Sequence, residues 1–268
     1  MKRFFERAHQ GHRTLAWPKE PLSLHPRWRG LPVLDPARCA AGCSACESAC
    51  PTGAISASPL RLDLGKCLFC LACSQACPTS AIAFSPDFRL GTRTRAALLL
   101  EGREGKDGRD GNDYQHAAAL DSELRRLFGR SLKLRQVSAG GCNACEGELN
   151  AAGNVVFDLG RFGVQFVASP RHADGIVVTG PVTRNMASAL RDTYAAVPSP
   201  KLVIACGACA ISGGPFAGSP ACDNGIPADI PVDLFLPGCP PHPMVFLDGV
   251  LRLLGRLPAG PARPDASV

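Results

Sequence analysis

Eight cysteines between residues 39 and 78 constrain the fold and the chemistry of this chain more than any other feature. They form two runs of four, with three, two and three residues between the cysteines of the first run and two, two and three in the second. A proline follows the last cysteine of each run. Such runs are typical of proteins with two [4Fe-4S] clusters, in which three close thiolates bind one cluster and the fourth binds the other. The chain is therefore predicted to carry electrons.

The spacing also predicts which cysteines share a cluster. We expect cluster 1 to be bound by Cys39, Cys43, Cys46 and Cys77, and cluster 2 by Cys67, Cys70, Cys73 and Cys50. The first run has one residue more than usual between its leading cysteines, and Gly42 is expected to absorb it as a small bulge. A pair of zinc ribbons is less favoured, because two four-cysteine runs with terminal prolines exceed what zinc sites need. A disulfide framework is less favoured still, because nothing marks secretion.

The length of 268 residues predicts two domains or one large one. The predicted parts are an extended N-terminal segment (1–35), a two-cluster bacterial ferredoxin domain of the α+β class (36–99), a charged, glycine-rich linker (100–115), an α/β domain (116–257) and a disordered tail (258–268). The ferredoxin domain contains an internal repeat, since Cys-Pro-Thr-Gly-Ala-Ile at 50–55 returns as Cys-Pro-Thr-Ser-Ala-Ile at 77–82. Each repeat would supply half of both cluster sites.

The second domain alternates between strand and helix patterns. Short apolar runs closed by glycine or proline predict strands at 132–137, 175–179, 201–205 and 231–236. Apolar residues at helical spacing predict helices at 116–128, 185–196 and 242–254. Short apolar strands that alternate with helices predict a parallel sheet covered on both faces.

Four of the six remaining cysteines follow the predicted strands. Cys142 and Cys145 follow the first, Cys209 the third and Cys239 the fourth. Because ligands of open parallel sheets bind beyond the carboxyl ends of the strands, these four thiolates are expected to meet and bind a third [4Fe-4S] cluster. A zinc site is the main alternative. Spacing alone does not decide between Cys206 and Cys209 as the third ligand.

Composition and charge argue against several classes of function and location. The formal charge of +6 falls once cysteines bind metal as thiolates, and no basic helix with interleaved aromatics supports nucleic-acid binding. No apolar stretch is long enough for a membrane span, and the basic start lacks a secretory signal, so a cytoplasmic location is expected. Phe4, Phe5 and Ala8 would share one face of a short basic helix that lies on a membrane surface or a partner, unless this terminus is frayed or simply packed.

Several short motifs in the second domain are distinctive: Leu127–Leu132, Gly141–Glu146, Ala168–Asp174, Thr179–Met186 and Pro237–Pro241. They resemble the small subunit of energy-converting, membrane-bound [NiFe] hydrogenases, above all of the formate hydrogenlyase type, a family related to the 20 kDa B subunit of respiratory complex I. Residues 1–99 separately resemble the ferredoxin-like subunit of the same complexes, including Trp17-Pro18 and Arg29-Gly30 before the first cysteine run. The two subunits look fused here.

The resemblance implies a flavodoxin-like fold for the second domain. It assigns Cys209 rather than Cys206 as the third ligand of cluster 3, because the family's ligand stands four residues before a Gly-Gly pair. No residue is expected to be catalytic, and none to bind nickel.

Four further residues follow from the motifs as candidates near cluster 3. Glu148 stands where the family often carries a glutamate, and with Glu146 it is a candidate for proton transfer or for the subunit interface. A charge at the start of a helix, with no chemical role, is the plain alternative for Glu148. His172 and Arg184 are expected to line the cluster, to contact the large subunit or to have a structural role only.

The resemblance further implies an electron-transfer subunit of an oxidoreductase with no active site of its own. Expected partners are a [NiFe]-hydrogenase-like large subunit, integral membrane subunits, and formate dehydrogenase or ferredoxin as electron donor, on the inner face of the cytoplasmic membrane. The nearest alternative is the equivalent subunit of a nickel-free, complex I-like quinone oxidoreductase, which usually has adjacent cysteines where this chain has Cys142-x2-Cys145. A stand-alone electron carrier or sensor and a zinc-dependent nucleic-acid binder are more distant alternatives.

Overall fold

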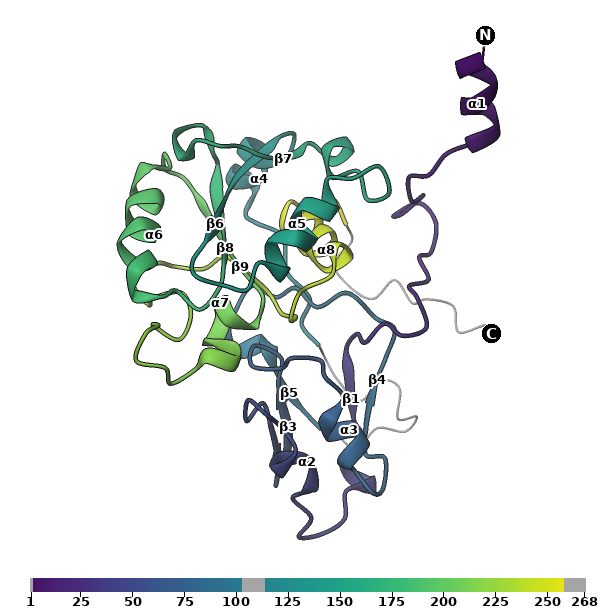
Figure 1. Ribbon diagram of the computed structural model, residues 1–268, viewed down its shortest axis with the longest axis vertical. Helices are drawn as coiled ribbons and strands as arrows, with labels where there is room; N and C mark the ends of the chain where they lie inside the picture. Colours follow the sequence, from purple (N-terminus) through teal and green to yellow (C-terminus); the bar gives the residue numbers. More distant parts are fainter. Residues whose placement is uncertain (1, 103–113, 258–268) are drawn as a thin grey trace.

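The computed structural model describes residues 2–102 and 114–257. Most of the predicted linker (100–115) and all of the predicted tail (258–268) lie outside the described residues. Figure 1 shows a lower region that carries the two cysteine runs, an upper region with a parallel sheet, and the helix α1 (Lys2–Gln10) away from both.

The lower region is built from short elements around the two cysteine runs. Its antiparallel strands are β1 (Pro32–Leu34) with β4 (Ile82–Phe84), and β2 (Ile55–Ala57) with β3 (Leu60–Asp63) and β5 (Leu99–Glu101). Its helices are α2 (Ala45–Ser48) and α3 (Ala72–Ala76), with the 3-10 turns η1 (Pro36–Arg38) and η2 (Ala96–Leu98). Because β5 pairs with β3, the sheet continues to Glu101, slightly beyond the boundary predicted at residue 99.

The upper region contains a five-stranded parallel sheet in the order β10-β9-β8-β6-β7. The strands are β6 (Leu132–Ser138), β7 (Val164–Phe166), β8 (Gly175–Thr179), β9 (Leu202–Cys206) and β10 (Leu234–Leu236). Counted along the chain, this is the 2-1-3-4-5 order of flavodoxin-like folds. Every residue of β8 and β9 is buried, as expected for central strands of a parallel sheet with helices on both faces. The predicted α/β class and flavodoxin-like fold are confirmed.

Helices cover both faces of this sheet. They are α4 (Ser122–Phe128), α5 (Ala144–Ala152), α6 (Arg184–Ala196), α7 (Ala208–Ser212) and α8 (Pro243–Leu253), with the 3-10 turns η3 (Leu159–Phe162), η4 (Pro170–His172) and η5 (Gly214–Phe216). In Figure 1 α6 lies on one side of the sheet, and α5 and α8 lie together on the other.

The structure corrects three details of the sequence analysis. The helix predicted at 116–128 begins only at Ser122, because the Asp121 carboxylate accepts hydrogen bonds from the amides of Glu123 and Leu124 and caps the helix there. The short edge strand β7 was not predicted. Nor was α5, which begins inside the predicted cysteine loop and shows little apolar periodicity in its sequence, Ala-Cys-Glu-Gly-Glu-Leu-Asn-Ala-Ala.

The two regions pack into one continuous structure. Thr92 and Phe235 exchange two backbone hydrogen bonds of 3.1 and 2.8 Å, which joins the lower region to the edge strand β10. The Ser212 hydroxyl donates to the carbonyl of Gly65 at 2.8 Å. One of the two apolar clusters among the described residues extends from Leu34 in β1 to α8 (Pro243–Leu253) and so includes both regions. The regions are therefore held in a fixed relation.

Candidate metal centres

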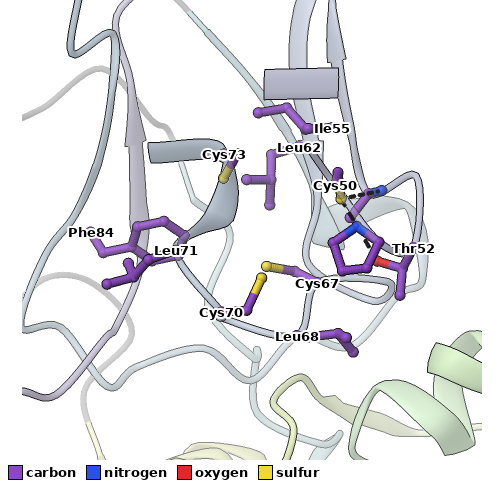
Figure 2. A pocket seen from close by; sticks show the side chains of 12 residues that line it. Cys50, Thr52, Ile55, Leu62, Cys67, Leu68, Cys70, Leu71, Cys73 and Phe84 are labelled. Atoms are coloured by element: carbon purple, nitrogen blue, oxygen red, sulfur yellow. Dashed lines mark hydrogen bonds between the residues drawn. The ribbon is translucent and has the colours of Figure 1, made fainter. Parts of the chain in front are cut away.

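Four cysteines surround one cavity in the lower region: Cys50, Cys67, Cys70 and Cys73 (Figure 2). Three come from the second run, and Cys50 reaches the cavity from the first, as predicted for cluster 2. Ile55, Leu62, Leu71 and Phe84 are among the apolar residues that close its walls. Burial and, to a smaller extent, the charges of neighbouring thiolates together raise the pKa of Cys67 to about 12 and that of Cys73 to about 11.

The crossing cysteines Cys50 and Cys77 have matching environments, because they belong to the internal repeat. The amide of Ala54 donates to the sulfur of Cys50 at 3.2 Å, and the amide of Ala81 donates to the sulfur of Cys77 at 3.2 Å. Burial raises the pKa of each thiol, but hydrogen bonds to sulfur outweigh it, so the net pKa of both is lowered. Both therefore favour the thiolate form that binds iron.

The threonine that follows each of these cysteines was missed as a functional residue. The hydroxyl of Thr52 lies 3.8 Å from the sulfur of Cys50, and that of Thr79 lies 3.6 Å from the sulfur of Cys77. The repeated Cys-Pro-Thr was the available signal.

The cysteines expected to bind cluster 1 lie at the far end of the lower region. Burial raises the pKa of Cys46, and the charges of Cys39 and Cys77 contribute, which places these three thiols near one another. Cys43 follows Cys39 through a turn closed by a hydrogen bond from its amide to the Ala40 carbonyl. Gly42 in this turn has a φ of 74°, which glycine adopts readily and which accommodates the extra residue.

The third group lies at the carboxyl edge of the parallel sheet. Cys142 and Cys145 come from the loop after β6 and the start of α5, Cys209 from α7 after β9, and Cys239 from the loop after β10. Burial, then the charge of Glu146, then the charges of the other three thiolates raise the pKa of Cys145 to about 12. Burial, then the charges of Cys239 and Cys142, raise the pKa of Cys209 to about 11. These four thiols are therefore electrostatic neighbours.

Gly207 keeps space open beside this third group. Its φ is 93°, and a Cβ atom there would stand 2.7 Å from the sulfur of Cys145. Cys206, one residue earlier, is the last residue of β9 and is 1% exposed. Among the thiols it interacts with Cys145, whereas Cys209 interacts with Cys142, Cys145 and Cys239. The geometry thus favours Cys209 within the group.

The donor sets fit [4Fe-4S] clusters. Burial, with the charges of neighbouring thiolates, raises the pKa of Cys46, of Cys67 and Cys73, and of Cys145 and Cys209, so a bound positive group would stabilise the thiolate forms of these cysteines. Within residues 2–102 and 114–257, no three His, Cys, Asp or Glu side chains are arranged to hold a single metal ion. A cluster binds each thiolate through a different iron atom, so its sulfur ligands stand further apart than those of one ion.

Glu146 is 4% exposed beside the third group, and its carboxylate accepts hydrogen bonds of 2.6 Å from the hydroxyls of Ser138 and Thr179. Burial raises the pKa of Glu146, but these two bonds outweigh it and the net pKa is lowered. Glu148 is half-buried, and burial raises its pKa.

The other two candidates lie at opposite edges of the sheet. Arg184 is exposed at the start of α6, on the same edge as the cysteine loops. His172 is exposed in η4, which precedes β8 and so lies at the amino edge.

The second and third cysteine groups meet where the two regions pack together. Cys239 lines a pocket together with Leu68 and Phe69, which precede Cys70. Burial raises the pKa of Cys239, and the charges of Cys142 and then of Cys70 contribute, so a thiol of the second group lies within electrostatic range of one of the third. The guanidinium of Arg29 donates to the carbonyl of Phe69 at 2.9 Å and ties down the loop that carries Cys70. Sequence spacing gave no signal for this proximity.

Two family descriptions match the chain. The "NADH ubiquinone oxidoreductase, 20 Kd subunit" family matches residues 142–253, and the "4Fe-4S binding domain" family matches residues 60–83. The first match covers the cysteines of the third group, and the second match covers the second cysteine run.

Three curated relatives match about half of this chain. The chain is 44% identical over 136 residues to a probable membrane-bound hydrogenase subunit, mbhJ, of Pyrococcus furiosus, which covers 51% of this chain and 81% of the relative. It is 41% identical to formate hydrogenlyase subunit 7 of Escherichia coli, over 52% of this chain and 55% of that one. It is 46% identical to the B subunit of NADH-quinone oxidoreductase of Heliobacterium modesticaldum, over 44% of this chain and 67% of that one.

These matches confirm the resemblance drawn from the motifs. The protein is an electron-transfer subunit of an oxidoreductase complex, in which a ferredoxin-like unit and the small-subunit unit are fused. The chain belongs to the family of the 20 kDa subunit of NADH ubiquinone oxidoreductase.

Proposed function

We propose that this chain relays electrons over three [4Fe-4S] clusters, in the order cluster 1, cluster 2, cluster 3, to or from the active site of a separate large subunit. The order is supported by the pocket that Cys239 lines together with Leu68 and Phe69, next to Cys70, and by the effect of the Cys70 charge on the pKa of Cys239. Cys50 and Cys77 cross between the two N-terminal ligand sets and keep clusters 1 and 2 together.

The chain's own residues would hold and tune the clusters. Each cluster supplies one-electron redox chemistry when bound. The proposed ligands are Cys39, Cys43, Cys46 and Cys77 for cluster 1, Cys67, Cys70, Cys73 and Cys50 for cluster 2, and Cys142, Cys145, Cys209 and Cys239 for cluster 3. Amide hydrogen bonds to the sulfurs of Cys50, Cys67 and Cys77 and the apolar wall of the cluster 2 cavity would set how readily clusters 1 and 2 accept an electron.

The two regions would have different roles in electron transfer. Residues 36–99 would receive or deliver electrons at the distal end, and residues 116–257 would present cluster 3 to the large subunit. Cys239 is an exposed member of its group, which supports an exit on the outer surface of the sheet edge.

The favoured partner is a [NiFe]-hydrogenase-like large subunit, together with integral membrane subunits. Cys142 and Cys145 have the hydrogenase-like spacing, and two relatives are named as hydrogenase and formate hydrogenlyase subunits. Electrons would come from formate dehydrogenase or ferredoxin, and the complex would sit on the inner face of the cytoplasmic membrane. Protons would be reduced to hydrogen in the large subunit.

A second candidate is the equivalent subunit of a quinone oxidoreductase without nickel. It is supported by the 46% identity to a NADH-quinone oxidoreductase subunit from Heliobacterium modesticaldum. Here the electrons would leave cluster 3 for a quinone.

Metal analysis of the complex that co-purifies anaerobically with this chain distinguishes the two. About one nickel per chain, with iron above the roughly twelve atoms of three clusters, supports the hydrogenase. The same iron content without nickel supports the quinone oxidoreductase. Iron well below twelve per chain overturns the three-cluster relay itself.

A further inference from the structure

The helix α1 stands apart from the rest of the protein. None of its nine residues is buried, and Figure 1 shows it away from both regions. Phe4 is 83% exposed and Phe5 is 74% exposed, more than the other exposed large apolar side chains of the described residues. Exposed neighbouring phenylalanines on a free helix mark a surface that binds something apolar.

The residues of α1 are sorted by chemistry around its axis. With about 3.6 residues per turn, Phe4, Phe5 and Ala8 fall on one side of the helix. Arg7 borders this face on one side and Lys2 lies toward the other, while Glu6 is on the polar side. The helix is therefore amphipathic, with basic residues beside its apolar face.

The base of α1 is anchored beside another exposed apolar side chain. The Thr14 hydroxyl donates to the carbonyl of Val155 at 2.8 Å, and the Leu15 amide donates to the carbonyl of Val156 at 2.9 Å. The side chain of Val155 is 71% exposed. Only residues 11–13 separate this anchor from α1, so α1 stays close to the surface of the protein.

We propose that α1 binds the surface of an anionic lipid bilayer, with Phe4 and Phe5 inserted at the level of the headgroups and the basic side chains against lipid phosphates. Charge complementarity selects this occupant, because basic residues that border an apolar face match the arrangement of phosphates above acyl chains. No described helix is long and apolar enough to span a bilayer. The inference goes beyond electron transfer and does not depend on whether nickel or quinone is the terminal partner.

The test is flotation of the full chain, purified anaerobically, with vesicles of phosphatidylcholine alone or mixed with phosphatidylglycerol. The chain is expected to float with the mixed vesicles and far less with phosphatidylcholine alone. The double variant Phe4→Ser, Phe5→Ser should lower binding about tenfold, and Lys2→Gln, Arg3→Gln, Arg7→Gln should do the same and abolish its salt dependence.

Matched variants outside α1 test whether α1 is responsible for vesicle binding. Leu127→Ser with Phe216→Ser removes two other exposed apolar side chains, and Arg126→Gln, Arg130→Gln, Lys133→Gln removes three other exposed charges. Both should leave flotation unchanged. The proposal is overturned if the chain does not float with the anionic vesicles, or if the matched variants lose binding to the same extent. It is also overturned if the chain is a dimer in solution and the Phe4, Phe5 variant dissociates that dimer.

Discussion

The two regions hold their clusters in different ways. The lower region has strands of three or four residues and helices of four or five, and its described core is lined by the cluster cysteines Cys46, Cys67 and Cys73. The upper region has a five-stranded sheet with buried strands and an almost fully buried α8, and its cysteines sit at one edge. In the lower region the proposed ligands are part of the core, whereas in the upper region they are added to a core that is already complete.

This contrast predicts different fates on loss of metal. Small domains without enough apolar core depend on metal for folding. We expect removal of iron by oxidation and chelation to expose the amides of residues 36–101 to hydrogen exchange, while those of β8 and β9 stay protected. Hydrogen exchange followed by mass spectrometry measures both at once. Equal loss of protection in the two regions would show that the contrast is wrong.

Single ligand substitutions sharpen the same contrast. Cys50→Ser removes a ligand from the cavity of cluster 2, so it should lower iron by about four atoms per chain and lower the unfolding temperature of the lower region. Cys209→Ala should lose a similar amount of iron with little change in the unfolding of the sheet. Cys206→Ala is the matched control, because Cys206 ends a buried strand, and it should keep the full iron content. Iron lost in Cys206→Ala and kept in Cys209→Ala would reverse the assignment.

The helix α8 of the upper region contains a buried ion pair that can be removed by substitution. Arg252 and Asp248 in α8 pair at 2.8 Å with side chains only 5% and 2% exposed. Asp248→Asn removes the charged half of this buried pair, which should cost about 3–5 kcal/mol of unfolding free energy. Asp229→Asn is the control, because its pair with Arg191 is exposed, and it should cost less than about 1 kcal/mol. Denaturant unfolding of the metal-loaded protein measures both, and equal costs would contradict the argument.

Sequence reasoning succeeded where a local pattern determines the structure. The apolar runs predicted β6, β8 and β9 closely, and the position of each cysteine after a strand predicted the third group. It failed where tertiary contacts decide. The edge strand β7 has three residues and exists because β6 offers it a pairing partner. Residues 117 and 120 are held by backbone bonds to Gly91 and Leu253, so no helix forms before Ser122.

Two site features were equally invisible in the sequence. The proximity of Cys70 to Cys239 depends on how the regions pack, and no spacing within either cysteine run encodes it. The hydroxyls that hold Glu146 come from the ends of β6 and β8, far from each other along the chain.

The smallest expected effect is a change in the reduction potential of cluster 3 on substitution of Glu146. The potentials of the other two clusters should not change. Its carboxylate is held by two hydroxyls beside Cys145, and its lowered pKa keeps it negative at neutral pH. A fixed negative charge opposes the arrival of an electron, so Glu146→Gln should raise the reduction potential of cluster 3 by some tens of millivolts. Glu146→Asp keeps the charge and should shift the potential less.

Redox titration followed by electron paramagnetic resonance reads the clusters separately. The potentials of clusters 1 and 2 should not move in Glu146→Gln, because their ligands lie in the other region. A shift in all three would indicate a general disturbance of packing. An unchanged reduction potential of cluster 3 would mean that the surrounding hydroxyls already neutralise the effect of this carboxylate. The electrostatic role assigned to Glu146 would then be wrong.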